Sequence, residues 1–323
     1  MVQRLKGVNQ GYKTTEFSVV FCSPLLEGWQ NLTKFLWGVT SYFYKFTNMK
    51  FTVEKNIVLE NLATKFFLVD AFVPEKEGKL PLVIFAHGYK GYKDWGAWNL
   101  MAEKFAKNGF YFVKFNFSHN GTSLEHPSDF ADLESFAQNN YSKELSDLNF
   151  VIEHFSKDNQ VDAEHITLIG HSRGGGISII SASENSKIKN LITLASVDTL
   201  NRFPVGEKLE EWKNQGVYYN YNSRTKQQMP HDIQFLEDYL ANEDRFSVEK
   251  AVKKFKGNFL IIHGSEDEAV QYSAAENLHF WAVNSELILV EKGNHTFGAK
   301  EPWLDFKLPT LLNTVVNDCI KFL

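Results

Sequence analysis

Short, almost uninterrupted apolar runs recur along this chain and alternate with stretches whose apolar residues follow helical spacing. The runs are LVIFA, HITLIG, LITLAS, NFLIIHG and ELILVE, which begin at residues 82, 165, 191, 258 and 286. Runs of this length, bounded by turn residues, are typical of strands buried on both faces of a sheet. Strands that alternate with helices form parallel crossover units. We therefore expect an α/β fold with a mostly parallel sheet and helices on both faces.

This pattern divides the chain into a main domain, one insertion and an N-terminal segment. The main domain spans 49–323, and its first two strands have no room for a helix between them, so we expect them to pair antiparallel at the sheet edge. Residues 198–256 are polar and helical in pattern, which predicts a short cap-like insertion over the carboxyl ends of the strands. Residues 1–48 form an aromatic extension that is either an accessory helix or a segment upstream of a true start at Met49.

Composition excludes several classes of function. The 323-residue chain has a formal charge of −5 and no isolated block of lysines, which argues against a nucleic-acid partner. Its two cysteines, Cys22 and Cys319, show no paired spacing, so we expect neither a disulfide framework nor a metal site. No stretch of about 18 consecutive apolar residues suggests a membrane span, and no signal peptide is evident. We expect a cytoplasmic protein, and the sequence leaves its oligomeric state open.

One serine stands between a buried strand and a glycine-rich helix. The segment GHSRG at 170–174 closes the run HITLIG and opens a helical run. A strand that turns directly into a helix strains its corner residue and raises the side chain clear of the sheet, and glycines on both sides avoid collisions. A glycine-rich turn with an incidental serine is the alternative. We interpret Ser172 as a candidate nucleophile.

A serine hydroxyl needs a base near neutral pH, and the base needs an orienting acid. After a serine at such a corner the acid and then the histidine follow along the chain. Asp267 follows the strand NFLIIHG, and His295 follows ELILVE, so both are expected at the same rim of the sheet as Ser172. The rival acids are Asp198, Glu266 and Glu268.

The glycine-rich segment HGYKG follows the strand LVIFA, where a loop can supply backbone donors to an oxyanion. We expect the N–H groups of Tyr89 and Arg173 to form that oxyanion hole. Several aromatic residues and Met229 are candidates to line an acyl pocket, and Arg224 or Lys226 could bind a carboxylate of the substrate. Packing in the core or at the rim of the domain is the alternative explanation for each of these residues. The aromatic candidates are Tyr89, Trp212, Tyr218, Tyr219 and Tyr221.

The segments HGYKGYKDWG, GHSRGG, HGSEDEAV and GNHTFG together resemble the α/β-hydrolase superfamily, over nearly all of the chain except residues 1–48. They are similar to the corresponding blocks of bacterial dienelactone-hydrolase-like and cinnamoyl or feruloyl-esterase-like serine hydrolases. The resemblance implies Ser172 as nucleophile, His295 as base, Asp267 as acid and Tyr89 and Arg173 as oxyanion donors. The chain also departs from three groups of this superfamily. Dienelactone hydrolases proper use a cysteine where this chain has Ser172, which argues against that activity. The insertion is short for a lipase lid, and the given sequence has no large N-terminal propeller like that of prolyl-oligopeptidase relatives, so we expect neither a lipase nor an oligopeptidase.

These observations predict a carboxylesterase that cleaves a small-molecule ester through an acyl-enzyme, with no metal and no organic cofactor. Two alternatives remain open. One is a peptidase or amidase that uses the same groups, and the other is a binding protein of the same fold without catalysis.

Overall fold

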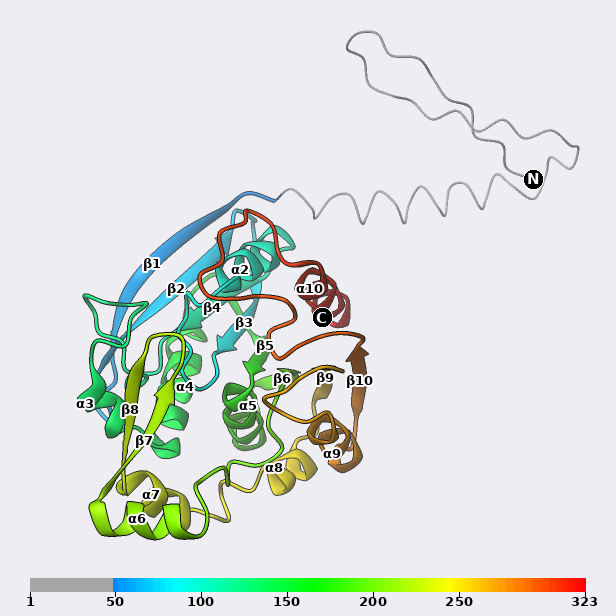
Figure 1. Cartoon of the computed structure of the whole chain (residues 1–323). Coiled ribbons are helices and arrows are strands. Elements are labelled where there is room, and N and C mark those ends of the chain that lie inside the picture. The colour runs from blue at the N-terminus through cyan, green and yellow to red at the C-terminus, as the bar shows by residue number, and fades with distance from the viewer. Residues whose placement is uncertain (1–48) are drawn as a thin grey trace, which may run out of the picture. The chain divides into compact units, whose positions relative to one another are not determined.

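The computed structural model describes residues 49–323, so the expectations for residues 1–48 lie outside the described residues. Ten strands and nine helices are described (Figure 1). The strands of the main sheet are β1 (Phe51–Glu60), β2 (Phe66–Pro74), β3 (Leu80–Ala86), β4 (Tyr111–Phe115), β5 (Val161–His171), β6 (Ile188–Leu194), β9 (Asn258–Gly264) and β10 (Ser285–Val290). The helices that follow these strands are α2 (Trp98–Lys107), α3 (Leu133–Ala137), α4 (Tyr141–Phe155), α5 (Arg173–Glu184), α9 (Ser273–Trp281) and α10 (Thr310–Phe322).

The eight strands form one sheet in the order β1-β2-β4-β3-β5-β6-β9-β10. β2 is antiparallel to both of its neighbours, and every other pair is parallel. The prediction that the first two strands pair antiparallel at the edge is therefore confirmed, and so is the mostly parallel sheet.

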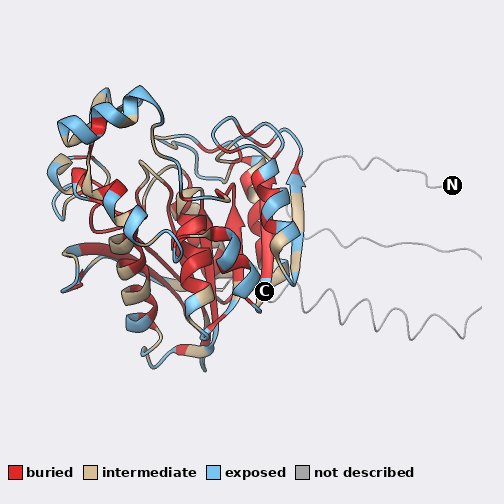
Figure 2. Ribbon diagram, turned by 90° about the horizontal axis from the view of Figure 1, so that it is seen from below, coloured by how far each residue is buried: buried red, intermediate tan, exposed pale blue. Residues whose placement is uncertain are grey.

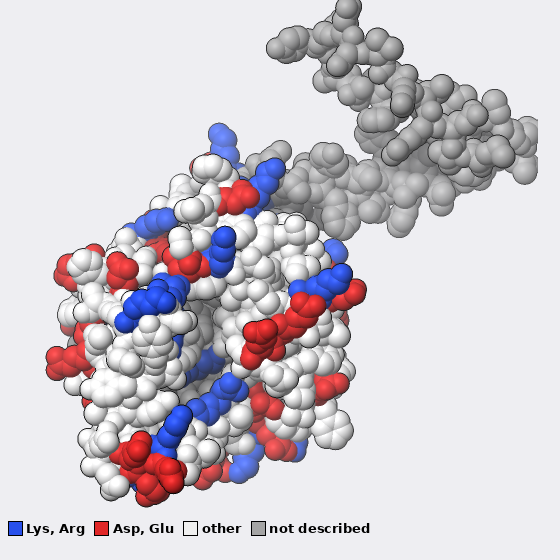
Figure 3. Space-filling model, viewed as in Figure 1, with Lys and Arg blue, Asp and Glu red and all other residues white. Residues whose placement is uncertain are grey.

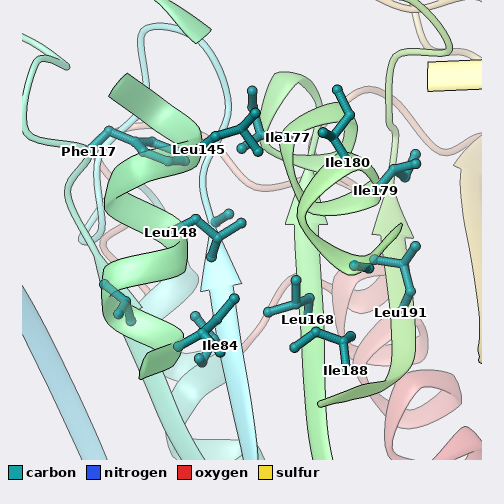
Figure 4. Close-up of a cluster of buried hydrophobic side chains, with 14 of the residues drawn as sticks. Ile84, Phe117, Leu145, Leu148, Leu168, Ile177, Ile179, Ile180, Ile188 and Leu191 are labelled. Carbon is teal, nitrogen blue, oxygen red and sulfur yellow. The ribbon is translucent and has the colours of Figure 1, made fainter. Parts of the chain in front are cut away.

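Helices cover both faces, because successive strand residues point to opposite sides. Leu82 and Ile84 of β3 belong to the core that contains α4, α5 and α9, whereas Val83 and Phe85 belong to the core beneath α2 and α10. Figure 4 shows side chains of α4 and α5 pointing onto β3, β5 and β6 in the first of these cores. Figure 2 shows buried residues in the sheet and on the inner sides of the helices.

Strand register brings the loops of the predicted site to one rim. Ala86 at the end of β3 pairs with Gly170 of β5, and His171 pairs with Leu194 of β6. On the other side, Gly264 at the end of β9 pairs with Val290 of β10. The loops after β3, β5, β9 and β10 therefore all begin at the carboxyl rim of the parallel sheet, where open α/β sheets bind ligands.

The segment between β6 and β9 contains more than the helical insertion that its polar pattern suggests. It contains the helices α6 (Glu207–Gln215), α7 (Gln234–Ala241) and α8 (Val248–Lys254). An antiparallel hairpin of β7 (Val217–Asn222) and β8 (Gln227–Asp232) lies between α6 and α7. The sequence of β7, VYYNYN, is rich in aromatic residues, which favour strands. The sequence analysis expected only helices in residues 198–256, so the hairpin differs from that prediction.

None of the helices in the described part of the chain combines the length and apolar character needed to cross a bilayer.

Candidate active site

Ser172 occupies the turn between β5 and α5. Its φ of 54° and ψ of −122° lie outside the regions that non-glycine residues usually adopt. The backbone holds this conformation with a hydrogen bond from the Ser172 N–H to the Leu194 carbonyl at 3.0 Å and one from Gly175 N–H to the Ser172 carbonyl at 3.0 Å. The strained corner places Ser172 on the wall of a cavity at the carboxyl rim.

Glycines around this corner allow very close backbone packing. A Cβ atom on Gly174 would lie 2.4 Å from the carbonyl oxygens of Ala86 and His87, which is far inside van der Waals contact. A Cβ on Gly88 would lie 2.8 Å from the Cβ of Ser172. The loop after β3 therefore approaches Ser172 directly, and only residues without a side chain fit between them.

This approach brings the two expected oxyanion donors toward Ser172. Arg173 is the first residue of α5, where backbone N–H groups have no partner within the helix. Tyr89 directly follows Gly88, where an added Cβ would collide with the Cβ of Ser172. Within residues 49–323 neither the Tyr89 nor the Arg173 backbone N–H donates a hydrogen bond, so both are available to a ligand.

The loop that carries Tyr89 is fixed by four charges that we call the buried charge ring: Asp70 of β2, Lys114 of β4, and Lys93 and Asp94 of the loop. Lys114 Nζ lies 2.6 Å from both carboxylates, and Lys93 Nζ lies 2.7 Å from Asp70 and 2.5 Å from Asp94. Both lysine side chains and that of Asp70 are fully buried. Burial alone would raise the pKa of Asp94, but Lys114 and Lys93 outweigh it and hold that pKa far below its usual range.

His295 and Asp267 lie together at the rim. His295 Nδ1 is 2.8 Å from Asp267 Oδ2, and the imidazole lines the same cavity as Ser172. Within the described residues the Ser172 hydroxyl forms no hydrogen bond with His295. Catalytic hydrogen bonds are often long when no substrate is bound.

Asp267 is held in place and kept ionised by its neighbours. Its Oδ1 accepts hydrogen bonds from the Ala269 and Val270 N–H groups, both at 2.9 Å, and its side chain is fully buried. Burial alone would raise the pKa of Asp267, but hydrogen bonds from His263 and His295 outweigh it and lower that pKa well below its usual range.

The rival acids are placed elsewhere. Asp198 accepts a hydrogen bond from Asn277 at 2.8 Å and lines a different cavity, and Glu266 and Glu268 are exposed. Of the four candidates, the structure brings only Asp267 to His295.

His171 supports His295 in a way that the sequence analysis missed. Its Nε2–H donates to the His295 carbonyl oxygen at 2.9 Å, and the two rings lie 4.8 Å apart between centroids. Burial, together with the nearby His295, lowers the pKa of His171 to about 3, so the ring is neutral. The only signal in the sequence is its place beside Ser172 in GHSRG.

The cavity beside Ser172 and His295 has a volume of about 390 Å³. Tyr89, Trp212 and Tyr218 line it as expected, but Tyr219, Tyr221 and Met229 do not. Arg224 and Lys226 do not line it either, and the Arg224 guanidinium packs 5.6 Å from the ring centroids of Tyr92 and Phe130.

Two further contacts join the cavity wall to distant parts of the chain. The Tyr89 hydroxyl and His231 Nε2 of β8 are hydrogen-bonded at 2.7 Å, which connects the loop that carries Tyr89 to the β7–β8 hairpin. Arg173 Nη1 donates to the buried Glu144 Oε1 of α4 at 3.3 Å. Each pair is far apart in sequence, so no local pattern could have predicted it.

No group of three or more His, Cys, Asp or Glu side chains in residues 49–323 is arranged to hold a metal ion. The site can instead supply a hydroxyl, an imidazole backed by a carboxylate, and two free backbone donors. That set of groups is suited to acyl transfer.

Comparison with known proteins agrees with this geometry at the level of fold. The family model described as alpha/beta hydrolase fold matches residues 81–246. No curated protein sequence matches the chain significantly.

Several solved structures share the architecture. Est1E from Butyrivibrio proteoclasticus with bound ferulic acid has a TM-score of 0.62 at 19% identity and covers 82% of this chain and 97% of its own. DcsB in complex with a substrate analogue has a TM-score of 0.62 at 15% identity and covers 84% and 98%. The acylaminoacyl peptidase of Pyrococcus horikoshii has a TM-score of 0.53 at 16% identity and covers 79% of this chain and 39% of its own.

Proposed function

The chain belongs to the alpha/beta hydrolase fold family, and from that premise we propose that it is a serine hydrolase that cleaves carboxylic esters. The observation that supports this most directly is the Asp267–His295 hydrogen bond at the rim of the cavity that Ser172 also lines. The esterase named among the structural neighbours is consistent with an ester substrate but, at 19% identity, does not assign one.

In the proposed mechanism Ser172 Oγ attacks the ester carbonyl carbon while His295 Nε2 takes the hydroxyl proton. Asp267 holds Nδ1–H of His295, which leaves Nε2 free as the base and stabilises the imidazolium that forms. The carbonyl oxygen, on which negative charge develops, accepts hydrogen bonds from the N–H groups of Tyr89 and Arg173. Removing one donor of this kind typically costs about 3–4 kcal/mol of transition-state stabilisation.

His295 then passes its proton to the alcohol oxygen as the ester C–O bond breaks, so that the alcohol leaves and the acyl group stays bonded to Ser172 Oγ. The second half of the reaction repeats these proton movements with water in place of the serine hydroxyl. The imidazole then takes a proton from water, the hydroxide oxygen adds to the acyl carbon, and Ser172 leaves with the proton returned. Water is consumed, and one carboxylic acid and one alcohol are released.

The test is turnover of short 4-nitrophenyl esters by the wild type and by Ser172→Ala. We expect the variant to lose at least about 10³-fold in kcat with an unchanged fold, since removal of a serine nucleophile costs that much or more. Ser183→Ala is a matched control at the opposite end of α5, where the hydroxyl donates to the Ile180 carbonyl. Turnover by Ser172→Ala close to the wild-type rate would remove Ser172 from the mechanism.

The two alternatives are separated by labelling and by substrate. A fluorophosphonate probe should label the wild type and not Ser172→Ala, whereas a protein that only binds its ligand should not be labelled. Matched ester and amide substrates with the same acyl group then distinguish an esterase from a peptidase or amidase. Faster amide turnover would replace the ester assignment.

A further inference from the structure

Cationic side chains line the cavity beside Ser172, although the chain as a whole is acidic. Two of the described residues that line it are arginines, Arg173 and Arg202, and none is Asp or Glu. Figure 3 shows basic side chains inside and along the hollow next to the β7–β8 hairpin. Lys90 adds a third cation near it, because its Nζ donates to Asn220 of the cavity wall at 2.7 Å.

The Arg173 guanidinium is held at the wall with most of its donors unused. It lies 4.2 Å from the ring centroid of Tyr89, 5.4 Å from that of Phe235 and 5.6 Å from that of Tyr141. Among the described residues its only hydrogen bond is the one to Glu144. A guanidinium carries five N–H donors, so the group keeps donors for a ligand that enters the cavity.

Arg202 approaches the same space from the loop after β6. Its Nη2 donates to the Ala269 carbonyl at 3.1 Å, and its side chain lies at the exposed edge of the cavity. Burial raises the pKa of Tyr141 to about 12, and Arg173 and Arg202 both act against that rise. Both cations are therefore within electrostatic range of one hydroxyl on the cavity wall.

The rest of this wall is aromatic. Phe203 and Trp212 rings lie 5.9 Å apart between centroids, Trp212 and Tyr218 lie 5.8 Å apart, and Phe203 contacts Phe235 at 5.4 Å. Such surfaces take the apolar part of a ligand, whereas guanidinium groups bind a carboxylate through charge-assisted hydrogen bonds.

We propose that the substrate is an ester whose acyl group ends in a second carboxylate, that is, a monoester of a dicarboxylic acid. Its apolar middle lies against the aromatic wall, and its free carboxylate binds Arg173 and Arg202. This inference rests on the proposed hydrolase function. Hydrolysis of the ester bond consumes one water and releases the free dicarboxylate and the alcohol.

The test compares 4-nitrophenyl monoesters of adipic, pimelic and suberic acid with the same compounds methylated on the far carboxyl. The members of each pair have the same chromophore and chain length and differ mainly in charge. We expect at least one charged ester to exceed its methylated partner in kcat/KM by about 10-fold or more, as charge-assisted hydrogen bonds provide. No preference for any charged ester would overturn the inference.

Three variants assign the preference to the cavity. Arg202→Gln should lower the ratio of charged to methylated turnover, and its exposed position protects the fold. The double variant Arg173→Gln/Glu144→Gln removes the buried cation together with its partner and keeps the Arg173 backbone N–H. Arg245→Gln is the matched control, because its guanidinium binds Glu184 at the far end of α5, and it should leave the ratio unchanged. A ratio that neither arginine variant changes would overturn the inference.

Binding separates this inference from the proposed function. Free pimelate and suberate are titrated into Ser172→Ala by calorimetry, which measures binding without turnover. If the same dicarboxylates bind more weakly to Ser172→Ala/Arg202→Gln, the carboxylate site is supported even where no ester is cleaved. Hydrolysis of methylated esters without any such binding leaves the hydrolase assignment in place and overturns the carboxylate site.

Discussion

Replacing Lys114 with methionine tests how the buried charge ring supports the loop that carries Tyr89. Methionine fills most of the space of the lysine stem, so the main loss is the ammonium group that bridges Asp70 and Asp94 at 2.6 Å on each side. The two carboxylates then share Lys93 alone, and a net negative charge remains buried. Breaking a buried pair in this way typically costs about 3–5 kcal/mol.

That cost is a large fraction of the free energy of unfolding of most domains, which is about 5–15 kcal/mol. We expect the variant to fold, with its midpoint of thermal unfolding lowered by about 5–15 °C. Urea denaturation followed by circular dichroism gives the free energy directly, provided that the slope with denaturant is unchanged. Turnover of a 4-nitrophenyl ester, measured at a temperature well below the midpoint, shows separately whether the loop that carries Tyr89 has moved.

The destabilisation should also depend on pH with a defined sign. With one ammonium removed, burial and the neighbouring carboxylate raise the folded-state pKa of one aspartate above its unfolded value. The folded variant then binds a proton more tightly than the unfolded chain, so its stability increases as the pH falls through that raised pKa. The difference in unfolding free energy from the wild type should be smaller at about pH 5 than at about pH 8.

A charge-balanced variant provides the control. Lys114→Met/Asp94→Leu removes one charge of each sign and leaves the Lys93–Asp70 pair at 2.7 Å. It should be more stable than Lys114→Met alone, because no uncompensated charge is buried. The reasoning is refuted if Lys114→Met unfolds within about 1 kcal/mol of the wild type at neutral pH, or if the double variant is the less stable of the two.

Three further predictions follow from single residues. Gly174→Ala should lower ester turnover by about 100-fold or more, since its Cβ would lie 2.4 Å from two carbonyl oxygens at the end of β3 and would push the oxyanion loop away; wild-type rates in this variant would show that the loop position is unimportant. Asp267→Asn should reduce kcat by about 10⁴-fold near neutral pH, because the amide favours the wrong tautomer of His295, and a loss of less than about 10-fold would assign the acid elsewhere. Burial raises the pKa of Asp147 to about 6, so the folded state holds this proton more tightly than the unfolded chain and gains stability as the pH falls through that value. The unfolding free energy of the wild type relative to Asp147→Asn should therefore decrease by about 1.4 kcal/mol from about pH 5 to about pH 8, and a difference that is independent of pH would contradict the shift.

The sequence predicts those parts of the fold whose causes are local. Helix α4 runs from Tyr141 to Phe155, and its buried apolar residues recur at helical spacing, which is a local signal for a helix. The Asn140 side chain caps it by accepting a hydrogen bond from the Lys143 N–H. The corner at Ser172 is also predictable from nearby residues, because the neighbouring glycines indicate positions where the packed backbone leaves no room for a side chain. The β7–β8 hairpin escaped prediction because the surrounding segment is polar and helical in pattern.

Contacts between residues that are far apart along the chain are harder to predict from the sequence. Tyr89 and His231 are 142 residues apart, and neither residue type indicates the other. Asp70 and Lys114 do leave a signal: each is the lone charge in an otherwise apolar strand, and the two are opposite in sign. A charge is costly to bury unless it is paired, so two such strands are expected to be neighbours, and β2 and β4 are hydrogen-bonded with these residues in register.

A buried ring of charges adds little net stability, since well-packed apolar residues of similar volume often serve as well. Its effect here is on position. Lys93 and Asp94 can satisfy their charges only where Asp70 and Lys114 are fixed in the sheet, so the loop after β3 has one arrangement of low energy. The Lys93 backbone N–H adds a hydrogen bond to Asn116 Oδ1 at 2.7 Å. The proposed role of the Tyr89 N–H as an oxyanion donor requires placement within about 0.5 Å, and a loop whose charges are paired with fixed charges on neighbouring strands meets that requirement better than a loop held by apolar contacts alone.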